Sequence, residues 1–122
     1  MSLRIANVTF DCTEPAQVAA FWSEVLGRPL APDANEFFAL VPPVDDASGV
    51  PTLLFLKVPE PRTAKNRVHL DLVADDQAAE VARVLALGAT HVHDKAEYGI
   101  TWTTLQDPEG NELCIAEHPA DD

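Results

Sequence analysis

The chain contains a histidine and an aspartate at a spacing that could put both in one binding site. His69 and Asp71 lie on the same face of any strand that contains them, because successive side chains of a strand alternate between its faces. An imidazole at such a position can bind a ligand or move a proton near neutral pH. A second interpretation stays open, in which His69 is a half-buried structural residue bonded to Asp71, Asn7 or the backbone.

Other polar positions share the predicted orientation of His69. Asn7 and Thr9 occupy the polar face of an early strand, and Glu112 and Cys114 have the inward parity on the last strand. Trp102 is either a wall of the cavity or a core residue. We assign no catalytic residue, and the predicted ligand-binding set is Asn7, Thr9, His69, Asp71, Trp102, Glu112 and Cys114.

The remaining reactive side chains are interpreted as inert. Cys114 would need a nearby base and a lowered pKa to act as a nucleophile, and the sequence shows neither. His91 and His93 are expected on the solvated face of a strand. Tyr98, like Trp102, is assigned equally to the cavity wall or to the core.

Two strand–helix units must position these residues. Alternation of apolar and polar residues predicts strands at 4–12 and 67–74. Each strand is followed by an acidic turn and an apolar stripe of helical period, and each stripe ends at a glycine, Gly27 or Gly88. Thr13 is the expected cap of the first helix, with Pro15 in its first turn, and Asp75 or Asp76 caps the second.

Shorter extended segments complete each unit. In the first half we expect a weak strand at 28–31 and two more at 36–41 and 52–58; in the second half we expect strands at 90–94, 100–106 and 112–117. Residues 95–99 are predicted as a loop and 107–111 as a tight turn with Pro and Gly. The chain is therefore one domain, 1–122, built from modules at 4–58 and 67–117 with a proline-containing connector at 59–66.

Net charge and composition limit the kinds of molecule that this protein is expected to bind. The formal net charge is −12 and the hydrophobic fraction 47% in 122 residues, so one domain can bury a real core. The acidic charge argues against nucleic acid and against anionic membrane surfaces. It would suit a cationic small ligand, and the alternative is an acidic cytoplasmic protein whose charge serves only solubility. No stretch is expected to be a transmembrane span or a signal peptide. Cys12 and Cys114 have no paired spacing, which favours free thiols in a reducing cytoplasm and leaves a disulfide between them as the alternative.

Three motifs together resemble one superfamily. Phe21-Trp22 followed by Leu26-Gly27, the run at 65–71 and the turn at 107–112 are similar to the glyoxalase/bleomycin-resistance/extradiol-dioxygenase (vicinal oxygen chelate, VOC) superfamily. Residues 58–61 resemble its uncharacterised bacterial glyoxalase-like branch. The resemblance implies an α+β fold of two βαβββ modules that form a curved mixed sheet around a cavity, commonly in a homodimer.

The resemblance also implies a divalent metal in the enzymes of this group, with ligands at positions that fall on Asn7, His69 and Cys114. Only His69 has the expected type, because a histidine and a glutamate would stand at the other two positions. Asn, His and Cys together are a poor set for the ions that prefer carboxylate and imidazole. We therefore expect no metal and no cofactor; the alternative is a divalent metal that involves His69, with Asp71 or Glu112 as substitute ligands.

Two functions of different class follow. The first is a metal-independent protein that binds a small molecule in its cavity, by sequestration, as resistance proteins of this superfamily do with basic drugs. The second is a metal-dependent lyase, isomerase or dioxygenase of the same superfamily. The acidic charge and the incomplete ligand set favour the binding protein.

Overall fold

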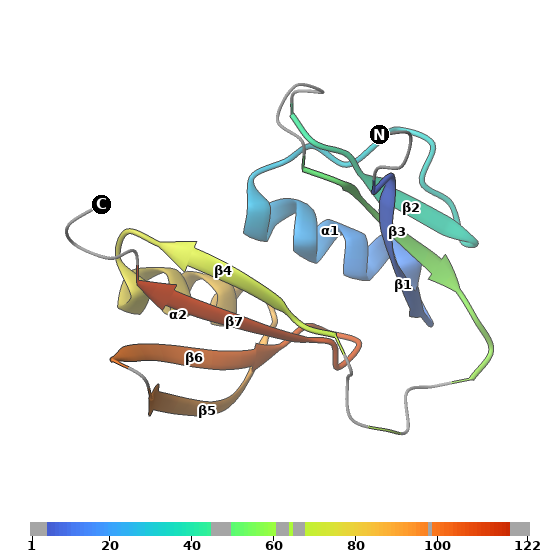
Figure 1. Cartoon of the computed structure of the whole chain (residues 1–122). Helices are drawn as coiled ribbons and strands as arrows, with labels where there is room; N and C mark the ends of the chain where they lie inside the picture. The colour runs from blue at the N-terminus through green and yellow to red at the C-terminus, as the bar shows by residue number, and fades with distance from the viewer. Residues whose placement is uncertain (1–4, 45–49, 61–63, 65–67, 98, 118–122) are drawn as a thin grey trace. The chain divides into compact units, whose positions relative to one another are not determined.

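The computed structural model describes residues 5–44, 50–60, 64, 68–97 and 99–117, and it divides into two compact units, Met1–Arg62 and Thr63–Asp122. The division falls within the predicted connector at 59–66. Each unit consists of one helix and its own sheet (Figure 1). Among the described residues, no helix is long and apolar enough to span a membrane. The two units are described separately below.

The first unit has a three-stranded sheet in the order β1-β3-β2. Its elements are β1 (Asn7–Cys12), α1 (Pro15–Leu26), β2 (Phe38–Val41) and β3 (Thr52–Lys57). β1 runs parallel to β3 and β2 runs antiparallel to it. The parallel pair requires a crossover, and α1 provides it.

Aromatic packing forms the core of this unit. The ring of Phe10 on β1 stacks on Phe55 of β3 and on Trp22 of α1, with centroids 5.1 and 6.0 Å apart. Trp22 is fully buried, which confirms the prediction, made from its helical spacing, that it is a core residue. α1 ends at Gly27, whose φ of 65° is the left-handed conformation expected there.

The second unit has a four-stranded sheet in the order β4-β7-β6-β5. It has the predicted βαβββ order: β4 (Leu70–Ala74), α2 (Gln77–Ala86), β5 (Thr90–Glu97), β6 (Ile100–Gln106) and β7 (Glu112–Glu117). β4 is parallel to β7, and the other two pairs are antiparallel. The first and last strands of the unit are therefore neighbours, so residues far apart in sequence can meet on one face.

The tight turn between β6 and β7 forms as predicted and fixes their register. The carboxylate of Asp107 is buried and accepts the backbone N–H groups of Glu109 and Asn111 at 2.8 and 2.9 Å, and the Asn111 side-chain amide at 2.9 Å. Gly110 has a φ of 87°, which an L side chain rarely adopts. Asp107 therefore satisfies donors that the turn leaves without strand partners.

Asp76 caps α2 as predicted, because its side chain accepts the N–H of Ala79 at 3.1 Å. A second carboxylate, that of Glu117 at the end of β7, accepts the N–H of Gln77 at 3.0 Å. Carboxylates at a helix N-terminus satisfy unpaired N–H groups and complement the helix dipole. These bonds attach α2 to the far end of β7.

Three local predictions were wrong. Glu14 rather than Thr13 occupies the N-cap position of α1. Within the described residues no strand forms at 28–31, where one hydrogen bond of 3.0 Å from Ala31 N–H to Leu40 C=O holds the chain against β2. β5 continues through Glu97 instead of giving way to a loop after residue 94, because this segment pairs with β6. The longer β5 adds side chains to the site described next.

Candidate functional site

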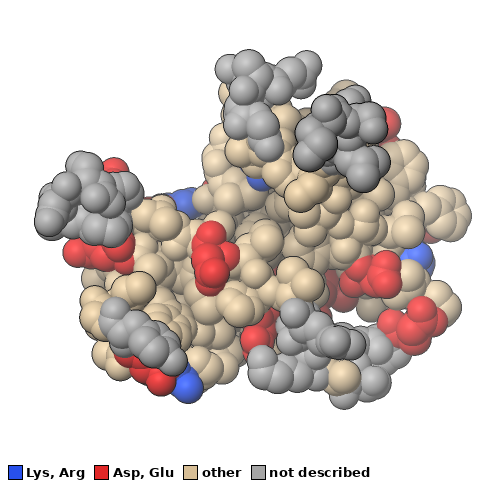
Figure 2. All heavy atoms as spheres, viewed as in Figure 1, with Lys and Arg blue, Asp and Glu red and all other residues tan. Residues whose placement is uncertain are grey.

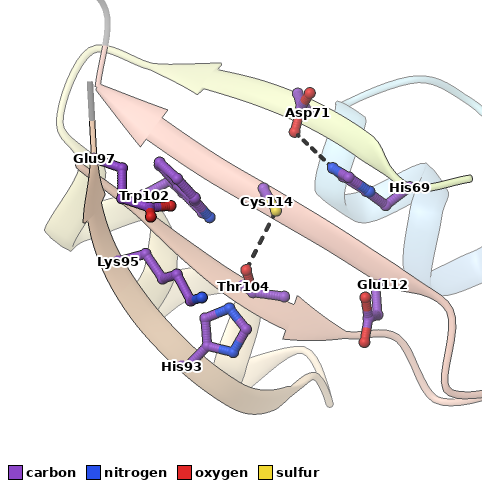
Figure 3. A pocket seen from close by; sticks show the side chains of 9 residues that line it. All are labelled: His69, Asp71, His93, Lys95, Glu97, Trp102, Thr104, Glu112 and Cys114. Carbon is purple, nitrogen blue, oxygen red and sulfur yellow. Dashed lines mark hydrogen bonds and ion pairs between the residues drawn. The ribbon is translucent and has the colours of Figure 1, made fainter. Parts of the chain in front are cut away.

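One face of the sheet β4-β7-β6-β5 carries a pocket of about 480 Å³, which we call the sheet pocket (Figure 3). Ligand pockets in proteins typically have volumes of about 300–1,000 Å³. All four strands contribute to it, and its lining residues are His69, Asp71, His93, Lys95, Glu97, Trp102, Thr104, Glu112 and Cys114. Because all of these residues belong to the second unit, the site can be built from that unit alone.

Strand register brings one side chain from each strand into a row across the pocket. Asp71 of β4 pairs with Cys114 of β7, which pairs with Thr104 of β6, which pairs with His93 of β5. Neighbouring strands are about 5 Å apart, so side chains on one face of such a row are close enough to interact. Leu113 and Ile115, the neighbours of Cys114 along β7, are buried in the core.

Cys114 lies at the centre of this row and is only 8% exposed. Its Sγ is 3.3 Å from the hydroxyl Oγ1 of Thr104, which is also buried. Burial raises the pKa of the Cys114 thiol, although the bond to Thr104 acts in the opposite direction. The thiol is therefore not activated as a nucleophile, which supports the inert interpretation.

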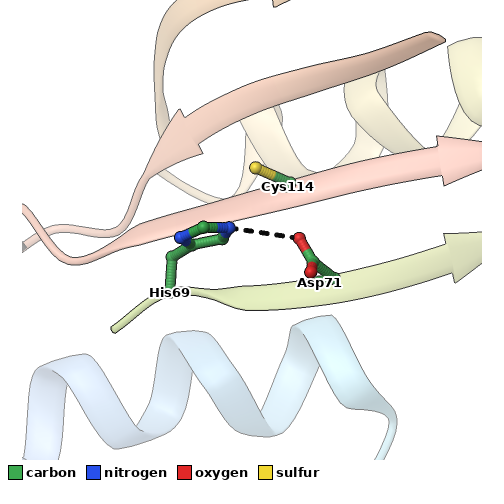
Figure 4. A group of neighbouring side chains, drawn as sticks. All are labelled: His69, Asp71 and Cys114. Carbon is green, nitrogen blue, oxygen red and sulfur yellow. Dashed lines mark ion pairs between the residues drawn. The ribbon is translucent and has the colours of Figure 1, made fainter. Parts of the chain in front are cut away.

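His69 and Asp71 lie beside Cys114 on the same face (Figure 4). The Nε2 atom of His69 is 3.4 Å from Oδ1 of Asp71, and the two side chains are 47% and 77% exposed. One ligand atom from each of His69, Asp71 and Cys114 lies within 4.8 Å of the other two. The contact with Asp71 agrees with part of the structural interpretation of His69, but the imidazole remains open to the pocket.

These three donors permit a test of the metal that the resemblance implies. Imidazole, carboxylate and thiolate together suit Zn²⁺ and similar borderline ions, whereas Mg²⁺ and Ca²⁺ take oxygen ligands. The group therefore fits a divalent ion that tolerates sulfur. The expected absence of a metal stays a prediction. Asp71, considered only as a substitute in the sequence, contacts His69 directly.

The charge of the lining is negative. Asp71, Glu97 and Glu112 contribute carboxylates, and among the lining residues that the structure describes Lys95 is the one lysine or arginine. Trp102 adds an aromatic surface at the β5–β6 side of the pocket, next to Glu97 (Figure 3). On the face that Figure 2 shows, acidic side chains are also more prominent than basic ones, in agreement with the net charge of −12. Such a lining attracts cations.

The structure brings together five of the predicted site residues: His69, Asp71, Trp102, Glu112 and Cys114 line the sheet pocket. Asn7 and Thr9 belong to β1 of the first unit, where both are exposed, and are not among the lining residues. Their participation in ligand binding stays a prediction. Tyr98 lies outside the described residues.

Sequence reasoning missed four lining residues: His93, Lys95, Glu97 and Thr104. Thr104 could have been found, because it has the same parity as Trp102 on β6. His93 is exposed, as predicted, but also lines the pocket, and the strand register shifts between His91 and His93. Such a bulge changes which face later residues occupy, so parity counted along the sequence does not carry through it.

Solved structures with the same fold come from several bacteria. A glyoxalase/bleomycin resistance protein/dioxygenase family enzyme from Burkholderia phytofirmans PsJN has a TM-score of 0.75 at 20% identity, covering 94% of this chain and 98% of that chain. A glyoxalase-related enzyme from Fulvimarina pelagi has a TM-score of 0.71 at 17% identity, covering 95% and 88%. A lactoylglutathione lyase from Agrobacterium tumefaciens has a TM-score of 0.64 at 21% identity, covering 96% and 94%. At these identities the likeness shows the fold alone.

Comparison with curated proteins finds no match. The family model of the glyoxalase-like domain matches residues 7–116, which include every described strand and helix except the final residue of β7. The two-unit α+β architecture, the relatives of the same fold and this match agree. The chain therefore belongs to the glyoxalase-like domain family, within the glyoxalase/bleomycin-resistance/dioxygenase superfamily.

Proposed function

We propose that this protein binds a small organic cation with a flat aromatic group in the sheet pocket and sequesters it. The observation that carries the proposal is the lining itself, whose described residues include three carboxylates, one lysine and an indole. A cation over an indole ring gains roughly 0.5–2 kcal/mol, depending on how far it is desolvated. Glu97 and Glu112 supply the opposite charge, and Trp102 supplies the aromatic surface.

A charge-matched ligand series tests the proposal. Naphthalene-2-carboxamidinium, naphthalene-2-carboxamide and naphthalene-2-carboxylate have nearly the same shape and differ in charge. We expect calorimetric titration to rank them cation, neutral, anion, with the cation bound at least fivefold more tightly than the amide. Equal binding of the cation and the neutral amide would contradict the proposal.

Matched variants connect that preference to the pocket. Glu97→Gln and Glu112→Gln should each weaken binding of the amidinium by roughly 0.5–1 kcal/mol, about two- to fivefold, and leave amide binding unchanged. Asp75→Asn is the control, because it removes the same charge from an exposed residue outside the sheet pocket. If Asp75→Asn weakens amidinium binding as much as the pocket variants, the preference comes from net charge alone.

A second candidate function is supported by the group of His69, Asp71 and Cys114. In this alternative the protein is a metal-dependent lyase, isomerase or dioxygenase acting on a small oxygenated substrate, with the ion beside the pocket. A bound divalent ion supplies Lewis-acid chemistry in such enzymes. The binding protein remains our first choice, because the lining selects for positive charge without any further component.

We further propose that the protein acts in the cytoplasm as a homodimer. The two free, buried cysteines suit a reducing compartment. Light scattering coupled to size-exclusion chromatography tests the oligomeric state, for which we expect a mass twice the 13.2 kDa of the chain. A single species at the mass of one chain across micromolar concentrations would contradict this expectation.

A further inference from the structure

We propose that His69, Asp71 and Cys114 form a site for one thiophilic divalent cation of the Zn²⁺ class, at the β4–β7 side of the sheet pocket. The first proposed function does not require this ion, whereas the second candidate function rests on it, and the inference here adds the third donor and the preference for a thiophilic ion. His69 and Cys114 stand at two of the metal positions that the superfamily resemblance implies. Asp71 takes the place of Asn7 of the first unit, so that all three donors lie in the second unit.

The backbone geometry aligns the three side chains. Asp71 and Cys114 are directly paired residues of the parallel strands β4 and β7. His69 precedes Asp71 by two positions on the same chain segment, and its imidazole contacts the Asp71 carboxylate at 3.4 Å. The three donors therefore converge from two adjacent strands onto one face (Figure 4).

The distances are close to those of a tetrahedral site. Zinc bonds of about 2.0–2.3 Å to nitrogen, oxygen and sulfur require donors roughly 3.3–3.6 Å apart. The separation of His69 Nε2 and Asp71 Oδ1 already satisfies this, and all three donor atoms lie within 4.8 Å. The largest gap exceeds the ideal by about 1 Å. The exposed side chains of His69 and Asp71 can close it by rotation while buried Cys114 stays fixed.

The surroundings of the donors suit a bound ion. The hydroxyl of Thr104, 3.3 Å from Cys114 Sγ, can donate to a metal-bound thiolate and hold it in place. Three protein ligands leave a fourth tetrahedral position open, as in zinc sites that exchange a water molecule. Because His69 and Asp71 are exposed, that position is accessible from the pocket.

Metal titration of the full chain tests the site. Protein purified with reductant is treated with a chelator, dialysed, and titrated with Co²⁺ as a spectroscopic probe and with Zn²⁺ in competition with a chromogenic chelator. We expect one ion per chain, a thiolate-to-cobalt charge-transfer band, and displacement of Co²⁺ by Zn²⁺ but not by Mg²⁺. Absence of Zn²⁺ binding, or displacement by Mg²⁺, would overturn the proposal.

Variants assign the ligands. Cys114→Ser should abolish the charge-transfer band, and His69→Ala should weaken Zn²⁺ binding on the order of 100-fold or more, since losing even an outer partner of a ligand typically costs 10- to 100-fold. Cys12→Ala and His91→Ala are controls, because they remove the other free thiol and a histidine that does not line the pocket. His69 is exposed, so its truncation tests the site even if Cys114→Ser fails to fold. If His69→Ala binds Zn²⁺ as tightly as the wild type, His69 is not a ligand and the proposed site is wrong.

The two proposals fail separately. Organic-cation binding is measured with the chelator present, and metal binding is measured with no organic compound. Zinc binding without amidinium binding would leave the ion site standing and refute the proposed function. Amidinium binding without zinc binding would do the reverse.

Discussion

At the level of single residues, the two tryptophans have opposite roles. Trp22 is fully buried between α1 and the first sheet, whereas Trp102 lines the sheet pocket. Trp22→Ala should lower the free energy of unfolding by about 3–5 kcal/mol, as other large-to-small changes in cores do. Trp102→Ala should change the free energy of unfolding much less, but should remove most of the amidinium binding. Urea unfolding and calorimetric titration of both variants measure the difference.

One result would contradict the different roles assigned to Trp22 and Trp102. If Trp102→Ala unfolds at the same urea concentration as Trp22→Ala, its indole is a core residue and the pocket loses its aromatic wall. Trp102→Phe is the matched control, because it keeps an aromatic surface of smaller size. It should retain part of the amidinium binding.

Asp94 gives a pH-dependent prediction. The hydroxyl of Thr103 donates to Asp94 Oδ1 at 2.7 Å, and His91 Nε2 lies 3.3 Å from Oδ2. The bond from Thr103 and then that from His91 hold the pKa of Asp94 below its ordinary value. A depressed carboxyl pKa contributes stability that is present above the unfolded pKa and is lost as the pH falls through the folded pKa.

Asp94→Asn should therefore lower the urea midpoint relative to wild type at pH 7, and the difference should shrink as the pH falls below about 4. Asp75→Asn serves again as a control of equal charge, and its difference from wild type should not follow that profile. A difference for Asp94→Asn that is constant between pH 7 and pH 3 would show that the carboxylate charge is not the cause.

Residue parity explains how much of the site the sequence could predict. His69 and Asp71 on β4, and Glu112 and Cys114 on β7, share a face because a strand alternates strictly, and all four line the pocket. The close approach of Asp71 to Cys114 depends on pairing between strands at opposite ends of the unit. No local pattern in either strand specifies that partner. It was the resemblance to the superfamily that placed His69 and Cys114 together, with Asp71 only as a substitute.

At the level of elements, the turn between β6 and β7 is expected to contribute strongly to stability through its hydrogen bonds. Asp107 accepts three hydrogen bonds within the turn, two of them from backbone N–H groups. Asp107→Ala leaves these buried donors unsatisfied and should lower the free energy of unfolding by roughly 2–4 kcal/mol. Thermal and urea unfolding measure this loss.

The adjacent Pro108→Ala is the matched control, since Pro108 is exposed and no hydrogen bond of its side chain can be lost. It should change stability by less than about 1 kcal/mol. Similar losses for both variants would mean that turn conformation, rather than the Asp107 carboxylate, stabilises the β6–β7 pair.

Element boundaries show where sequence patterns are insufficient. The alternating strands and the two helices with terminal glycines could be predicted, because burial of one face imposes a period that can be counted. The end of β5 could not: Lys95, Ala96 and Glu97 are weak strand formers that pair with β6 because β6 is present beside them. Likewise, one hydrogen bond at Ala31 was too little to make the predicted strand.

For the whole molecule, net charge and pocket lining act in the same direction. With a net charge of −12, the long-range field attracts organic cations at low ionic strength, while the lining carboxylates act at short range. Raising the salt concentration from 20 to 500 mM, where the screening length falls from about 20 Å to about 4 Å, should weaken amidinium binding severalfold and leave amide binding unchanged. Calorimetric titration at both salt concentrations measures this.

The carboxylate probe completes that experiment. Its binding should strengthen, or at least not weaken, when salt screens its repulsion from the protein. If the neutral amide loses affinity in parallel with the amidinium, the salt acts on the protein itself rather than on the attraction between charges.

The row of Asp71, Cys114, Thr104 and His93 has a consequence for how this scaffold changes its chemistry. Leu113 and Ile115, which flank Cys114 on β7, are buried in the core and do not belong to the row, so a change of donor in the row leaves them in place. Cys114→Glu would exchange the sulfur donor for an oxygen donor. The ion preference should then shift from zinc-like toward manganese-like. A single substitution at position 114 of β7 would thus change which metal ion the pocket prefers.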